Sequence, residues 1–356
     1  MPLPAHPLVP PAAFAIMAVA PVLPGSTAMA VVSAVMLFVA VFAAVHHAEV
    51  VAHRVGEPYG TLVLALAITV IEVALILSLM LAGGAQTATL PRDTLFATVM
   101  IICNGVVGVC VLTGGIRHRE QSFQIAGVAP ALGALVVLCG LTLVLPVYTV
   151  SSPEGTYTEA QLRFVALAAL ATWAVFVFVQ TVRHRDYFLP PATPGDETRH
   201  AAPPSARQAA LSGGLMTIAL VAVVGLAKRL SPEVEALLAG VGAPKSVAGI
   251  VVAALVLLPE TAAALQAARA NRLQTSLNLA LGSAMASIGL TVPAVVIAAA
   301  WLDLPLLLGL TAKDQVLLLM TFLVAAMTLG SGRTHVMQGA VHLVMFAAFL
   351  FLAVAP

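Results

Sequence analysis

The sequence predicts an all-α polytopic membrane protein. Hydrophobic residues make up 61% of the 356-residue chain and charged residues 9%, and the mean hydropathy is +1.05. Soluble domains carry about 25% charged residues. The apolar runs are long enough to cross a bilayer as helices, and they lack the short alternating pattern of β-barrel strands.

Charged residues, prolines and glycines divide the apolar sequence into about eleven predicted spans. The first run lacks the basic n-region of a secretory signal, so we interpret it as a short first span. The eleven spans are expected at residues 11–24, 26–48, 59–82, 94–113, 124–146, 161–182, 208–228, 246–268, 275–300, 313–330 and 335–355.

One hydrophilic segment, rich in proline and charge, separates two halves of the chain. With the first span set aside, five spans precede it and five follow it, and an odd number places homologous halves in opposite orientations, as in many secondary transporters. The predicted organisation is an extra N-terminal helix (1–25), a first five-helix repeat (26–182), a cytoplasmic linker (183–207) and a second five-helix repeat (208–356).

The distribution of charge favours a cytoplasmic N-terminus, because most Lys and Arg residues then fall on the cytoplasmic side. A net charge of +1 without a basic cluster argues against a nucleic-acid partner. Cys103, Cys110 and Cys139 lie inside apolar runs without metal-ligand or disulfide spacing, so we interpret them as packing residues.

Two carboxylic acids fall deep inside predicted spans. Glu72 lies near the middle of "LVLALAITVIEVALILSLML" (residues 62–81), and Glu260 lies in "LLPETAA" of the second half. An ionised side chain at the bilayer centre costs about 3 kcal/mol on insertion scales. No Lys or Arg falls at a comparable predicted depth, so each glutamate is expected to be protonated or to bind a cation.

The two halves repeat this pattern. Both glutamates fall in the second span of their half, and the third span of each half contains an N-x-x-x-G step, at Asn104–Gly108 and Asn278–Gly282. Two ionised carboxylates offer hard oxygen ligands to a cation, whereas two protonated carboxyls are neutral, so the pair suits exchange of protons for a cation. Further oxygens for the same site could come from Asn104, Asn278, Ser283, Thr69 and Thr261.

The same residues also have a purely structural interpretation. A protonated glutamate can hydrogen-bond between two helices, and Asn, Ser and Thr join membrane helices in the same way. That interpretation stays open for both asparagines and is preferred for Ser283, Thr69 and Thr261. For the glutamates, the matched positions in the two halves favour the ion site.

Four segments carry a family resemblance: "HAEVVAHRVGEPYGTLVLALAITVIEVALI" (47–76), "GGIRHREQSF" (114–123), "LPETAAALQAARANRLQTSLNLALGSAMASIGLTVP" (258–293) and "GRTHVMQGAVHLVMFAAFLFLAVAP" (332–356). With them the chain resembles the calcium/proton antiporters, in the bacterial sodium-potassium/proton and calcium/proton antiporter branch of the cation/calcium exchanger superfamily. The resemblance covers nearly the whole length.

The resemblance implies an extra first helix, two inverted five-helix repeats and a cation site at mid-membrane in a bacterial inner membrane. It also implies that Glu72 and Glu260 are the essential glutamates and that Asn104 is the asparagine of the third helix. The chain departs from the pattern where many relatives have Gly-Asn before each glutamate and glutamine after the second site serine. These positions are Ile68–Thr69, Val256–Leu257 and Ala286.

Two functions of other classes remain as alternatives. A membrane metalloenzyme could use His46, Glu49 and His53, which share a helix face but do not form an HExxH motif. An interfacial or gating role is preferred for them. A passive channel would need a continuous polar pore, whereas the polar residues concentrate at one depth. His335 and His342, seven residues apart, could line a proton path, although satisfied packing histidines are the preferred interpretation.

The sequence therefore predicts a secondary cation/proton antiporter that is not an enzyme and has no cofactor. The expected partners are membrane lipid, inorganic cations and protons. Calcium/proton exchange that exports Ca²⁺ is favoured, and sodium or potassium exchange on the same fold is the alternative. Both glutamates are expected to bind either the cation or protons, while sliding helices open the site to one side at a time.

Overall fold

The computed structural model describes residues 6–19, 27–56, 59–152, 156–188, 204–240, 242, 244 and 246–355. Within them the all-α prediction is confirmed, and ten helices are long and apolar enough to cross a membrane. The helix near the N-terminus, α1 (Val9–Val19), has 11 residues and is shorter than the roughly 20 that a span needs. The predicted linker is described only at its two ends.

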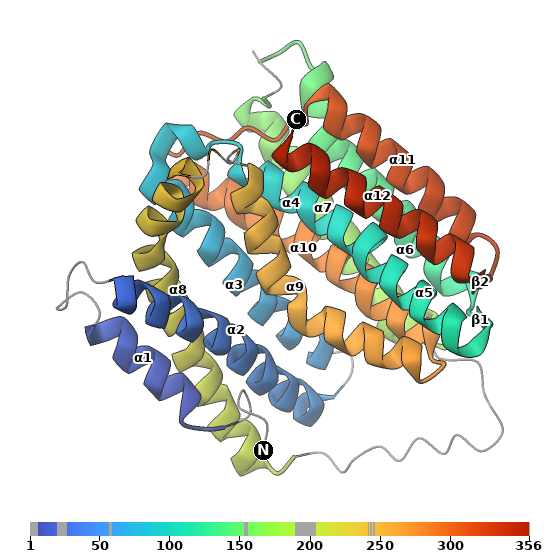
Figure 1. The fold of residues 1–356 in the computed structure, drawn as a ribbon, viewed down its shortest axis with the longest axis horizontal. Coiled ribbons are helices and arrows are strands. Elements are labelled where there is room, and N and C mark those ends of the chain that lie inside the picture. The colour runs from blue at the N-terminus through green and yellow to red at the C-terminus, as the bar shows by residue number, and fades with distance from the viewer. Residues whose placement is uncertain are drawn as a thin grey trace. The chain divides into compact units, whose positions relative to one another are not determined.

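The helices follow the predicted spans closely (Figure 1). The α-helices are α1 (Val9–Val19), α2 (Thr27–Val55), α3 (Tyr59–Gly83), α4 (Leu90–Met100), α5 (Val107–His118), α6 (Ile125–Cys139), α7 (Glu159–Phe178), α8 (Ala206–Gly240), α9 (Ser246–Arg269), α10 (Leu273–Leu302), α11 (Ala312–Leu329) and α12 (Val336–Val354). Shorter 3₁₀ and π segments are η3 (Gly84–Thr87), η4 (Ile101–Val106), η5 (Gly140–Val144), η6 (Leu145–Tyr148), η7 (Val179–Arg183) and η8 (Arg185–Tyr187).

The chain forms two compact units, each described here by itself. Unit 1 comprises residues 1–87 and 198–243, and unit 2 comprises residues 88–197 and 244–356. Helices α2, α3 and α8 of unit 1 pack against one another, and α1 lies on α2 and α8. Figure 1 shows α1 and α2 beside α8, although α8 follows them in the sequence by more than 150 residues.

Unit 2 is organised around one central span. Helices α4, η4 and α5 run without interruption from Leu90 to His118, and 89% of the most apolar part of this span is buried, the largest share among the ten candidate spans. It packs against α9 and α12, while α10 packs against α6, α7 and α9. The central position of this span makes its polar side chains candidates for function.

Capping residues fix several helix starts. Thr158 and Gln161 form a reciprocal capping box at the start of α7, and His335 and Gln338 form the equivalent at the start of α12. Ser205 and Gln208 exchange the same pair of hydrogen bonds at the start of α8. Each box satisfies two backbone N–H groups that the helix leaves without partners.

Helix α8 ends later than the sequence predicts. The expected span stops at Lys228, within a Lys-Arg pair and before a Ser-Pro step, but the helix continues to Gly240. Pro232 lies inside it and supplies no N–H to the carbonyl of Lys228. The hydroxyl of Ser231, the residue before it, donates to the carbonyl of Ala227 at 2.9 Å.

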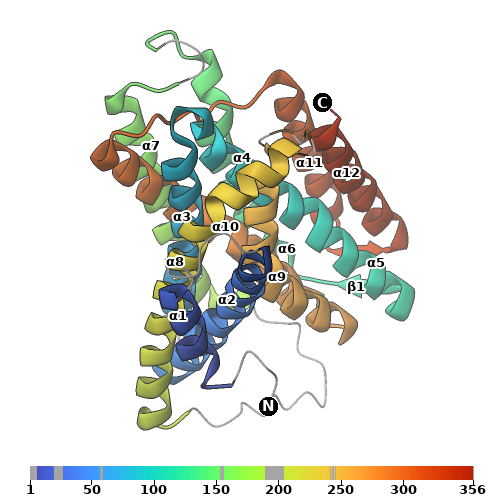
Figure 2. The same cartoon turned by 60° about the vertical axis from the view of Figure 1, so that its left-hand side comes forward.

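A short β-pair was not predicted. Strand β1 (Glu120–Ser122) pairs antiparallel with β2 (Arg333–His335), with Gln121 opposite Thr334. The pair joins the end of α5 to the start of α12, and Figure 2 shows these two helices on the same side of unit 2. Because three-residue strands carry almost no periodic pattern, the sequence gives little signal for them.

Helix α12 approaches the central span through glycines. A methyl group on Gly339 would lie 2.4 Å from the backbone nitrogen of Leu112, and one on Gly108 would lie 3.0 Å from the Cβ of His342. Small residues let membrane helices approach closely and gain van der Waals contact. The contact between α12 and the central span therefore depends on these two positions.

Replacing Gly339 with alanine should destabilise unit 2 by about 1–3 kcal/mol, because the added methyl group overlaps rigid backbone. We expect a lower melting temperature for the Gly339→Ala protein in detergent. The matched control is Gly133→Ala in α6, where an added Cβ meets nothing within 4 Å. Equal melting temperatures of the two variants would contradict the close approach.

Candidate cation-binding site

Glu72 is buried within a membrane helix of unit 1. It lies near the middle of α3, and its side chain is 1% exposed. Thr69, one turn earlier, is 7% exposed, so the two predicted site residues of this helix share a buried face. Lipid contact for Glu72 is therefore absent in this structure, which agrees with the cost of a carboxylate in hydrocarbon.

Glu260 lies near the middle of α9 in unit 2. Pro259 precedes it inside the helix, and proline supplies no N–H to the carbonyl four residues earlier. One backbone carbonyl in the turn before Glu260 therefore lacks the N–H donor that it would have in a regular helix. The hydroxyl of Thr261 donates to the carbonyl of Leu257 at 2.7 Å, so it bonds within its own helix.

Asn104 lies in a π-helical segment at the centre of unit 2. The segment η4 interrupts the span between α4 and α5, and Asn104 within it is fully buried. Single π-helical turns occur mostly inside α-helices and often at functional sites. The sequence indicated Asn104 through the N-x-x-x-G step, but the step does not predict the π-helical backbone.

Asn104 belongs to a chain of buried polar side chains from three elements. Its amide nitrogen donates to Thr321 of α11 at 2.8 Å, and its amide oxygen lies 3.2 Å from Nδ1 of His342 on α12. The Nε2 atom of His342 lies 3.1 Å from the hydroxyl of Thr328 on α11. Thr321 and His342 are 0% exposed and Thr328 is 3% exposed.

Asn278 has its own partners near the start of α10. Its amide oxygen accepts from Gln274 at 2.9 Å, and its amide nitrogen donates to the carbonyl of Phe188, just after η8. Gln274 in turn accepts from the backbone N–H of Gln124 at 2.6 Å. Asn278 thus joins α10 to two connecting segments, and its assignment as a cation ligand stays a prediction.

The repeated N-x-x-x-G step does not fall at the same position along its two helices. Asn104 lies 14 residues after the start of its span at Leu90, whereas Asn278 lies 5 residues after the start of α10 at Leu273. The two asparagines therefore do not occupy matching positions in their helices.

Removing the side-chain amide of Asn278 should weaken the attachment of residues 179–188, which include the start of the predicted linker. In Asn278→Leu, the carbonyl of Phe188 loses its side-chain donor, so we expect faster backbone hydrogen exchange in residues 179–188. Ser283→Ala, nearby on α10, is the control and should leave this exchange unchanged. Hydrogen exchange read by mass spectrometry tests both variants, and equal exchange would show that the amide does not hold the segment.

The histidine-rich stretch of α2 does not form a metal site among the described residues. Glu49 and His53 are exposed, and no group of three or more His, Cys, Asp or Glu side chains that could hold a metal occurs in the described part of the chain. His47 is buried instead, with Nδ1 3.4 Å from the hydroxyl of Ser212 on α8. The stretch thus contributes to helix packing in unit 1.

The two histidines near the C-terminus have different positions. His335 is exposed and caps α12, with Nδ1 accepting from the backbone N–H of Met337 at 3.3 Å. His342 is fully buried beside Asn104. No hydrogen bond of the described residues joins His335 to His342 or to a shared partner, so the two histidines do not form one proton path.

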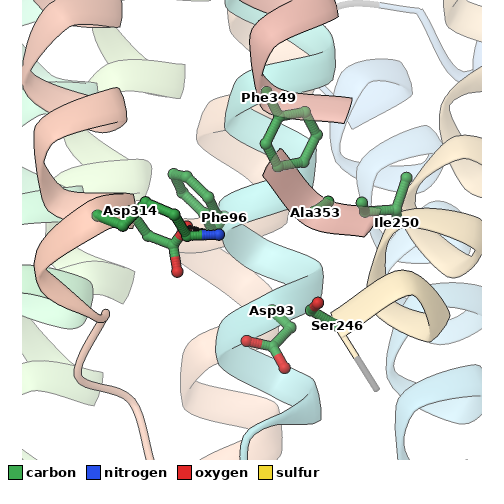
Figure 3. Close-up of a pocket in the computed structure, with 8 residues that line it drawn as sticks. Asp93, Phe96, Ser246, Ile250, Asp314, Phe349 and Ala353 are labelled. Carbon is green, nitrogen blue, oxygen red and sulfur yellow. Dashed lines mark ion pairs between the residues drawn. The ribbon is translucent and has the colours of Figure 1, made fainter. Parts of the chain in front are cut away.

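A cavity of about 30 Å³ in unit 2 lies away from the predicted site residues (Figure 3). It is lined by charged and apolar side chains near the ends of α4, α9, α11 and α12: Asp93, Phe96, Ser246, Ile250, Lys313, Asp314, Phe349 and Ala353. Asp93 is ion-paired with Arg92 at 2.8 Å, and Lys313 lies 3.4 Å from Asp314. Each of the two acidic side chains thus has a basic partner, and the pairs lie where the helix ends meet.

The ten long apolar helices among the described residues define a multi-pass membrane protein. A family model described as sodium/calcium exchanger protein matches residues 25–182 and 211–355. The chain belongs to this family, within which it is a cation exchanger.

Two relatives are similar over most of the chain. A Sinorhizobium fredii protein, y4hA, described as a candidate ionic transporter, is 45% identical over 347 residues, which cover 96% of this chain and 93% of the relative. The sodium-potassium/proton antiporter ChaA of Escherichia coli is 37% identical over 311 residues, which cover 87% of this chain and 84% of ChaA.

Solved structures confirm the fold. The structure of native YfkE has a TM-score of 0.74 at 16% identity, covering 98% of this chain and 99% of that one. Another structure of YfkE, described there as a Ca²⁺/H⁺ antiporter, has a TM-score of 0.69 at 15% identity and covers 98% and 99%. The predicted all-α polytopic fold is thereby confirmed. The predicted family resemblance is confirmed by the family model and the two relatives.

Proposed function

We propose that the chain is a cation/proton antiporter that exports Ca²⁺ at the expense of the inward proton gradient. The observation that carries this proposal is the buried carboxyl of Glu72, which lies inside a transmembrane helix at a depth where an ionised group needs a proton or a cation. Its counterpart in the second half of the sequence is Glu260.

In the proposed mechanism, Glu72 and Glu260 each bind either the cation or a proton. Two ionised carboxylates balance the charge of one divalent cation, and their protonation releases it. Asn104 supplies a neutral oxygen, with Asn278, Ser283 and Thr69 as further candidates. The protein acts in the bacterial inner membrane with its N-terminus in the cytoplasm, as the Lys and Arg distribution favours.

Sodium or potassium exchange is the second candidate cargo. The 37% identity to an antiporter named for sodium and potassium supports it, and so does the scarcity of oxygen side chains before each glutamate, at Ile68–Thr69 and Val256–Leu257. Calcium takes six to eight oxygen ligands, and Glu72 and Glu260 supply at most four, so Ca²⁺ would need at least two more from the predicted amides and hydroxyls.

Purified protein in liposomes with an internal pH-sensitive dye tests the proposal. With the lumen more acidic than the outside, we expect Ca²⁺ added outside to enter in exchange for protons that leave, which makes the lumen more alkaline. Na⁺ and K⁺ are compared at equal ionic strength. Cation flux that persists after the proton gradient is collapsed, with no coupled proton movement, would indicate a channel and refute the proposal.

Neutral variants of the glutamates should abolish exchange. Glu72→Gln and Glu260→Gln keep the side-chain volume but remove the negative charge and the exchangeable proton, so neither can alternate between proton and cation. The control is Glu159→Gln, whose exposed side chain pairs only with Arg163 one turn away on α7. Substantial exchange in both site variants, with normal elution in detergent, would rule out the assigned roles.

Proton competition should appear in the KM for the cation. Lowering the pH on the cation-binding side protonates a larger fraction of the same carboxylates, so the KM should rise at low pH while the maximal rate with saturating cation stays constant. Initial rates at several pH values measure this. A KM independent of pH would mean that protons and the cation do not share the carboxylates.

A further inference from the structure

We propose that His342 is a positioning residue that orients the carboxamide of Asn104 for cation binding. The inference rests on the proposed function, because it assigns Asn104 an oxygen that meets the transported cation. It goes beyond that function by giving a role to α11 and α12, which contain none of the predicted ligands.

Hydrogen-bond directions fix which end of the carboxamide faces which helix. The hydroxyl of Thr321 donates to the carbonyl of Leu317 at 2.8 Å, so its lone pairs accept from the neighbouring amide. The group of Asn104 at 2.8 Å from Thr321 is therefore its nitrogen. The amide oxygen then faces Nδ1 of His342, which must carry a proton to donate to it.

The same logic continues to Thr328. A neutral imidazole with its proton on Nδ1 has a lone pair on Nε2, and the hydroxyl of Thr328 at 3.1 Å can donate to it. One consistent set of donors and acceptors thus runs from Thr328 through His342 and Asn104 to Thr321. A flipped amide would need the hydroxyl of Thr321 to donate to Asn104 rather than to the carbonyl of Leu317, and it would reverse the tautomer of His342, with Nδ1 accepting and Nε2–H donating to Thr328.

This arrangement leaves one place for a ligand. Both N–H groups of Asn104 point toward α11 and Met100, with Thr321 at 2.8 Å and the sulfur of Met100 at 3.8 Å. The amide oxygen has two lone pairs, and His342 takes one of them. The second lone pair of that oxygen is the remaining hydrogen-bonding capacity of the side chain, and an oxygen lone pair is what a hard cation binds.

The closest side-chain contacts of Asn104 come from other helices. Thr321 lies at 2.8 Å and His342 at 3.2 Å, whereas Met100 in its own span lies at 3.8 Å. Gly108 and Gly339 allow α12 to approach closely enough for His342 to reach it. Outer partners that orient a ligand commonly change metal affinity about 10–100-fold when removed.

Cation/proton exchange by four variants tests the inference. His342→Leu removes the donor, and we expect its KM for the cation to rise about 10–100-fold with little change in maximal rate per folded transporter. His342→Gln keeps an N–H donor and should recover most of the affinity. Thr328→Val should raise the KM by a smaller factor, because the hydroxyl that selects the imidazole tautomer is lost.

The matched control is Thr142→Val in unit 2. Thr142 is also fully buried, and its hydroxyl donates to the carbonyl of Leu138 in its own helix, so its removal should not alter the KM. If His342→Leu does not fold, the comparison of Thr328→Val with Thr142→Val decides. An unchanged KM in Thr328→Val, or in a folded His342→Leu, would overturn the inference.

A second measurement is independent of transport. The histidine signal that is lost from the nitrogen-15 NMR spectrum in His342→Gln should be that of a neutral imidazole with its proton on Nδ1. A proton on Nε2 of His342 would overturn the inference. Absence of exchange in the wild-type protein would refute the proposed function, whereas normal exchange with an unaltered KM in the His342 and Thr328 variants would refute only the role of His342.

Discussion

The structure depends on one constraint: hydrocarbon offers no hydrogen-bond partners, so each polar group at membrane depth must be protonated, bonded within the protein or bound to an ion. The carboxyl of Glu72 is buried inside a helix bundle rather than exposed to lipid. Asn104, Thr321, Thr328 and His342 satisfy one another across two helices and a π-turn. Polar residues are few in the membrane part of this chain, and each of them must lie where a partner can reach it.

Most of the fold could be predicted from the sequence for the same reason. Helices that satisfy their own backbone need long apolar runs, and the ends of α3, α9 and α11 fall within two residues of the predicted spans. Helices α2 and α8 are exceptions, because they end seven and twelve residues later than predicted. In α8 the helix continues through a Ser-Pro step, which more often marks a turn or a helix start. The β-pair escaped prediction because it joins distant segments, and the π-turn η4 escaped because no sequence pattern marks it within an apolar run.

The candidate site was partly accessible from the sequence. Glu72 and Asn104 were indicated by their rarity and position in apolar runs, and both are buried. Thr321 and Thr328 were not indicated, because isolated threonines in membrane helices usually bond to their own backbone.

The β-pair has a mechanical consequence for transport. It clamps the end of α5 to the start of α12, and glycine contacts at Gly108 and Gly339 extend the attachment along both helices. We expect these two helices to move as one rigid body, because sliding one past the other would break both the strand pairing and the close packing at the glycines. In the proposed exchange cycle, a conformational step that moves Asn104 is then expected to move α12 with it, so that the carboxamide stays beside His342.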